Sequence, residues 1–157
     1  MSQVSVASRN FASRLIAQDA KSKNTFPSNR IDPFPVIEKF RAPLTNLMGA
    51  VGFGALISRS LALATAEIPT LRSVHVNAEG VWEGLAALEA QLGFDRFHEA
   101  RVVVLAHLLG LLVAFVGEAL TLRLVSEIWP NLPPTLTSDL SSNRQDFRKR
   151  DRNEKNK

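Results

Sequence analysis

The segment 102–117 contains no charged residue, and His107 is its only strongly polar side chain. The apolar pattern continues to residue 125, but only by including Glu118 and Arg123. A helix that spans a membrane needs about 20 mostly apolar residues, whereas a shorter uniformly apolar run more often forms a buried core helix. This segment therefore predicts either a membrane-spanning helix or a helix at the centre of a core.

A second apolar segment, residues 44–66, is a weaker candidate because it contains Arg59 and is diluted by three glycines. Pro69 follows and is expected to end this helix. A third, amphipathic helix is indicated by apolar residues at helical spacing before a stop at Gly93, namely Val81, Leu85, Leu88 and Leu92. The sequence therefore predicts an all-α fold, built from an antiparallel hairpin of two long apolar helices plus a shorter amphipathic helix.

Each long helix is expected to carry a narrow stripe of small and polar residues, because 100° of rotation per residue brings these positions to one face. On the second segment the stripe consists of His107, Gly110, Ala114, Glu118 and Thr121. On the first it consists of Thr45, Gly49, Gly52, Arg59, Ser60 and Glu67. Small residues let helix backbones approach closely. We therefore expect helix packing at Gly49, Gly52, Arg59, Glu67, His107, Gly110, Ala114 and Glu118.

One antiparallel register satisfies both stripes, and in it opposing residue numbers add up to about 175. This register places Glu67 near His107 and Arg59 near Glu118. A desolvated arginine without a partner is costly, and Glu118 is the only acidic residue in the opposite segment. The alternative is that Arg59 and Glu118 each reach solvent or lipid headgroups.

The net charge of +4 is unevenly distributed along the chain. Residues 1–43 carry seven basic and three acidic side chains, and so do residues 144–157, so each end has a net charge of +4. The centre, residues 44–143, has five arginines and nine acids, a net charge of −4. Two basic ends around an acidic, apolar centre do not indicate a nucleic-acid-binding face.

The same distribution suggests three parts. Residues 1–43 are expected to form an N-terminal basic helix and a proline-rich linker, residues 44–132 a helical domain, and residues 133–157 a disordered basic tail. In the first part, Phe11 and Leu15 share one side of the predicted helix. We expect this helix to dock on the body of the protein or on a membrane surface.

Motifs that carry chemistry are mostly missing. There is no cysteine, which excludes disulfides, zinc fingers and iron–sulfur clusters. The GxxxxG spacing of Gly49 and Gly54 lacks the lysine and the serine or threonine of a phosphate-binding loop. No catalytic, cofactor-binding or metal-binding residue is therefore predicted. His107 with Glu118 could form a proton or ion site, but a single histidine in an apolar helix is more often a hydrogen-bonded core residue.

Four stretches resemble a group of small, uncharacterised bacterial proteins with no assigned activity: NFASRLIAQDAK, FRAPLTNLMGAVGFGALISRSLALA, VHVNAEG and LLGLLVAFVGEALTLRLVSEIWP. The resemblance covers most of residues 10–132. It implies a bacterial source and a stand-alone protein. It implies no activity, ligand or catalytic residue.

Two functions fit these patterns, and neither is enzymatic. The first is a small membrane-associated protein with a structural or regulatory role, with both basic ends on the cytoplasmic side of an inner membrane and the segment 67–101 across it. The second is a soluble, cytoplasmic, all-α oligomeric interaction protein with the apolar helices buried in its core. A third, weaker alternative is an accessory protein that uses the His107–Glu118 site. The expected partner is a second copy or another protein, with a possible anionic membrane surface, and no nucleic acid, cofactor or small-molecule substrate is predicted.

Overall fold

The computed structural model describes residues 6–21, 35–77, 81–130 and 132. In these residues the chain forms helices α1 Val6–Lys21, α2 Pro35–Lys39, α3 Arg41–Glu67, α4 Leu85–Leu92, α5 Phe94–Val116 and α6 Glu118–Ile128. A 3-10 helix, η1, covers Pro69–Ser73, and two short antiparallel strands, β1 His75–Val76 and β2 Trp82–Glu83, pair Val76 with Trp82. The predicted all-α fold is confirmed, with this small hairpin as an addition.

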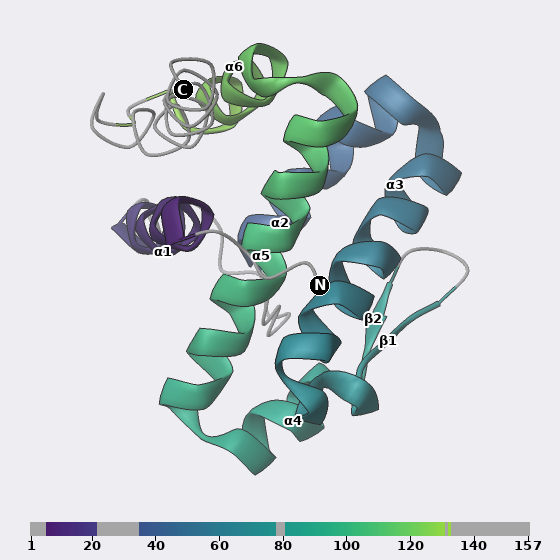
Figure 1. Cartoon of the computed structure of the whole chain (residues 1–157), viewed down its shortest axis with the longest axis vertical. Coiled ribbons are helices and arrows are strands. Elements are labelled where there is room, and N and C mark those ends of the chain that lie inside the picture. The colour runs from purple at the N-terminus through teal and green to yellow at the C-terminus, as the bar shows by residue number, and fades with distance from the viewer. Residues whose placement is uncertain (1–5, 22–34, 78–80, 131, 133–157) are drawn as a thin grey trace, which may run out of the picture.

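The two long apolar helices, α3 and α5, pack against each other in opposite directions (Figure 1). Helix α5 is the centre of the fold, because α1, α3, α4 and α6 all contact it. Its residues 103–109 are buried without interruption. The predicted hairpin is therefore present, and the middle of its second helix is buried by the rest of the protein.

The sequence predicts that the second apolar segment is one continuous helix to residue 125. This prediction is wrong. Helix α5 ends at Val116, Gly117 has φ 90° and ψ 161°, and α6 begins at Glu118. Gly49 has a similar conformation inside α3, with φ 81° and ψ 164°. This part of the Ramachandran plot is populated almost only by glycine. These two glycines therefore break segments whose apolar content alone predicts straight helices.

The predicted amphipathic helix corresponds to α4, which buries Leu85 and Leu88 and ends at Gly93 as expected. Its predicted start at Val81 is wrong, because the helix begins only at Leu85. Gly84 has φ 88°, and a Cβ there would lie 2.6 Å from the backbone oxygen of Ser73. The backbone of η1 thus lies too close to position 84 for a residue with a side chain. The helix therefore begins after this glycine.

Helix α1 belongs to the same core as the hairpin. It packs on α5 and buries Phe11, Ala12, Leu15 and Ile16. The predicted docking of this helix on the body of the protein is therefore present. The predicted boundary between residues 43 and 44 falls within the first turn of α3. The predicted proline-rich linker, apart from its last residues in α2, and the predicted tail of residues 133–157 lie outside the described residues.

We predict that Gly84→Ala lowers the free energy of unfolding by about 1–3 kcal/mol, because alanine at a positive φ is strained and its Cβ would press on the Ser73 carbonyl. Thermal or urea denaturation measures the change. Gly54→Ala is the matched control, since a Cβ at this position in α3 meets nothing within 4 Å. The control should stabilise the protein by up to about 1 kcal/mol. Equal effects of the two substitutions would contradict the close approach at Gly84.

Candidate functional site

A buried polar contact joins the two long helices. Glu67 is the last residue of α3, and its Oε2 lies 2.7 Å from Nε2 of His107 in the middle of α5. The side chains of His107 and Glu67 are only 5% and 13% exposed. Because an ionised carboxylate only accepts hydrogen bonds, Nε2 of His107 donates to Glu67. This is the contact that the antiparallel register predicts.

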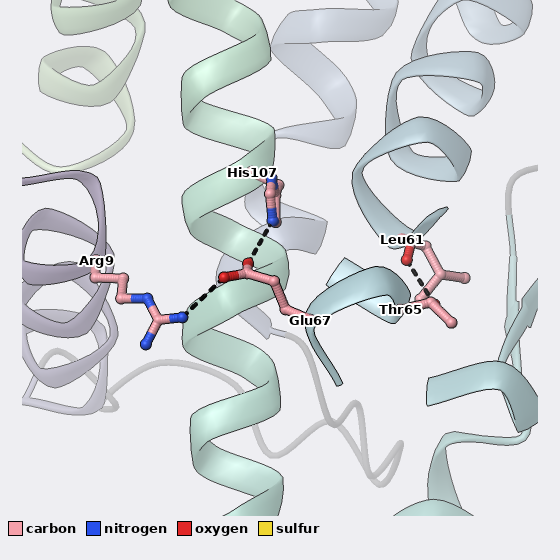
Figure 2. Close-up of polar contacts among 5 residues, drawn as sticks. All are labelled: Arg9, Leu61, Thr65, Glu67 and His107. Atoms are coloured by element: carbon pink, nitrogen blue, oxygen red, sulfur yellow. Dashed lines mark hydrogen bonds and ion pairs between the residues drawn. The ribbon is translucent and has the colours of Figure 1, made fainter. Parts of the chain in front are cut away.

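A third helix completes this cluster. Nη2 of Arg9, on α1, lies 3.0 Å from Oε1 of Glu67, so each carboxylate oxygen has a donor (Figure 2). A carboxylate at the C-terminal end of a helix is disfavoured by the helix dipole. The two donors offset this cost and tie α1, α3 and α5 together at one point. The sequence gives no signal for Arg9, because its partner is 58 residues away.

A second polar cluster, also missed from the sequence, holds the other end of α1. Asp19 is 5% exposed and forms an ion pair with Lys39 at the end of α2. Nε1 of Trp129, just after α6, donates to Oδ1 of Asp19 over 3.1 Å. The Trp129 ring also packs edge-on against Phe40, with 5.5 Å between ring centroids, and under the Lys39 ammonium at 5.7 Å. Helix α1 is thus fixed near both ends by charged groups on other elements.

The small residues of the predicted stripes do not pack between α3 and α5. Gly49, Gly110 and Ala114 are exposed, and a Cβ at either glycine would meet nothing within 4 Å. Gly52 is half-buried, and the atoms nearest to a Cβ there belong to the side chain of Met48 in the same helix. The nearest atoms to a Cβ at these glycines thus include none from another helix, and the predicted packing role of the four positions stays a prediction.

The predicted contact of Arg59 with Glu118 is absent. Arg59 is exposed and Glu118 is half-buried, and these two described residues form no ion pair with each other. The physical reason is the break at Gly117, which places Glu118 in the first turn of a new helix rather than along α5. The predicted alternative, in which Arg59 reaches solvent, agrees with its exposure.

The polar clusters have the character of structural contacts. His107 contacts Glu67 and not Glu118, so the predicted His107–Glu118 site is not formed. Among the described residues, no group of three or more histidine, aspartate or glutamate side chains is arranged to hold a metal ion. Both oxygens of Glu67 already have protein donors. What this arrangement does chemically is to orient three helices.

No family model, curated protein or solved structure matches this chain. The resemblance to small bacterial proteins therefore stays a prediction. The function is inferred from the contacts of the described residues alone.

We predict that Glu67→Ala lowers the free energy of unfolding by about 2–3 kcal/mol, because it leaves the buried His107 without its partner and removes the anion that Arg9 faces. Urea denaturation measures the loss. Glu127→Ala is the control, since Glu127 is 60% exposed and pairs with the exposed Arg123. The control should cost less than about 0.5 kcal/mol. A similar small loss for both variants would mean that the cluster does not hold the helices together.

Proposed function

We propose that this chain is a non-enzymatic, all-α interaction protein that works outside the bilayer and binds a protein partner. It corresponds to the second of the two functions predicted from the sequence. The observation that carries the proposal is the position of α1, which packs its apolar face on the most apolar helix, α5, and leaves polar residues exposed level with the middle of α5.

Length and composition leave the choice open. Helices α3 and α5 are both long and apolar enough to cross a membrane. The core helix of a soluble protein passes the same test, and half of the most apolar window of α5 is buried inside the protein. The choice therefore depends on where polar groups lie along these helices.

Helix α1 crosses α5 near its midpoint. In Figure 1, α1 is seen close to end-on, whereas α5 runs along the length of the molecule. The cluster of Arg9, Glu67 and His107 joins α1 to α5 at this level. If α5 spanned a membrane, the exposed Asn10 and Arg14 of α1 would lie near the centre of the bilayer. An arginine there costs about 2.5–3.5 kcal/mol on insertion scales and more by simulation.

Exposed apolar residues at one end of the hairpin support a protein contact. The N-terminal part of α3 and the C-terminal end of α5 lie at the same end of the molecule (Figure 1). Val51 on α3 is 88% exposed, Leu47 is 48% exposed, and Phe115 on α5 is 69% exposed. Large apolar side chains exposed at one end of a protein are available to bind a partner.

We predict that the expressed protein fractionates with the cytosol and purifies without detergent. The measurement is separation of cytosol from membranes, followed by an alkaline carbonate wash of the membrane pellet and light scattering on the soluble protein. Protein that resists the carbonate wash and needs detergent would contradict the proposal and favour the spanning hairpin. A known integral membrane protein and a known cytosolic protein from the same cells serve as controls for the wash.

A further inference from the structure

Gly117 is a one-residue hinge between two helices. Its φ of 90° and ψ of 161° lie in a region that other residues almost never adopt. A Cβ at this position would nevertheless meet nothing within 4 Å. Glycine is therefore required by the bend and not by lack of space. If Gly117 took helical dihedral angles, α5 and α6 would become one helix from Phe94 to Ile128.

The arm beyond this hinge, which consists of α6 and Trp129, packs against parts of the chain before the hinge. Helix α6 packs on α5 and buries Thr121, Leu124 and Val125. Trp129, at the end of the arm, donates a hydrogen bond to Asp19 of α1 and contacts Lys39 and Phe40. These partners of the arm all belong to parts of the chain that precede the hinge.

The surface of α5 just before the hinge is exposed and carries small residues. Gly110 and Ala114 are exposed, and a Cβ at Gly110 would meet nothing within 4 Å. The large side chain next to them, Phe115, is 69% exposed. On a continuous helix, Gly110 and Ala114 share one face with His107, Glu118 and Thr121. A second helix can approach closely along such a face.

From these three features we propose that the protein partner is a second copy of this chain, bound by exchange of α6. The helix straightens at Gly117, and each arm occupies the docking site on the other copy, with Trp129 against the partner copy's α1. Exchange of identical elements is a low-cost route to a dimer, because every contact of the arm is kept. The new contact joins the two α5 helices near Gly110 and Ala114. The inference rests on the proposed function, since it identifies the partner of a protein that works outside the bilayer.

Gly117→Ala tests the hinge. Alanine disfavours the bend and favours the straight helix, so the variant should shift the equilibrium toward the exchanged dimer. We expect the dimer dissociation constant to fall at least tenfold, measured by size-exclusion chromatography with light scattering in the absence of detergent. Gly93→Ala is the matched control, because Gly93 has nearly the same strained conformation and the same free space but lies between α4 and α5, away from the arm. The control should leave the dissociation constant unchanged, and an equal shift in both variants, or no shift in either, would overturn the proposal.

Gly110→Leu tests the new contact in the opposite direction. Its side chain enters open solvent in the monomer but blocks the close approach of two α5 helices. The dissociation constant of the dimer should rise at least tenfold, while the monomer unfolds at the same or a higher temperature, because leucine favours a helix more than glycine does. An unchanged dimer would overturn the proposed position of the second copy.

Exchange itself is detected by cross-linking in the wild-type background, which contains no cysteine. One preparation carries Asp19→Cys and the other Trp129→Cys, and the two are unfolded, mixed and refolded together. A short thiol cross-linker should join them into a product of twice 17.3 kDa, because the arm of one copy docks on α1 of the other. The control pairs Asp19→Cys with Ser126→Cys, an exposed position on α6, and should give little product.

The outcomes separate the two proposals. A soluble dimer without this cross-link would overturn the exchange of α6 while leaving the proposed interaction function intact. A protein that stays in the carbonate-washed membrane would overturn the proposed function itself. If Gly117→Ala does not fold, the cross-linking of the two wild-type-hinge preparations still decides the question, and absence of the product overturns the exchange.

Discussion

The middle of α5 is buried over residues 103–109, and this burial determines where the other helices lie. Seven consecutive helical residues cover about two full turns, so they point in every direction around the helix axis. Neighbours are needed on all sides to bury them. Helices α1, α3, α4 and α6 all contact α5, from parts of the chain on both sides of it in the sequence. The arrangement of the helices around α5 thus follows from one segment of α5 that has no polar face.

His107 lies within this buried stretch, and its ring makes a second demand on the fold. A buried polar group needs a hydrogen-bond partner. Glu67 provides it from the end of α3, and Arg9 balances the carboxylate from α1. Apolar packing alone would allow α1 and α3 to slide along α5, whereas this cluster fixes one position for each. Its contribution is therefore as much to the register of the helices as to stability.

The parts of the fold that follow from local sequence were predictable. The charge-free segment 102–117 indicates the central helix, Gly93 marks the end of α4, and the stripes give the antiparallel register that brings Glu67 to His107. The break at Gly117 was not predictable, because an isolated glycine is compatible with a helix and the bend depends on where α6 docks. The contact of Asp19 with Trp129 was also missed, since 110 residues separate them and no periodicity connects them. Side chains that meet across such a separation are determined only by the assembled core.

Hydropathy does not distinguish a membrane helix from the central helix of a small soluble domain, because both must be apolar around the whole circumference. The distinction lies in what covers the helix at its midpoint. Lipid requires an apolar covering, whereas a neighbouring helix with one polar face can bury its apolar side on the central helix and expose the other side to water. Under the proposed function helix α1 is of the second kind: Phe11 and Leu15 face the core, and Asn10, Ser13 and Arg14 are exposed. The amphipathic helix at the N-terminus, rather than the apolar helix it covers, therefore carries the information about the environment in which this fold is stable.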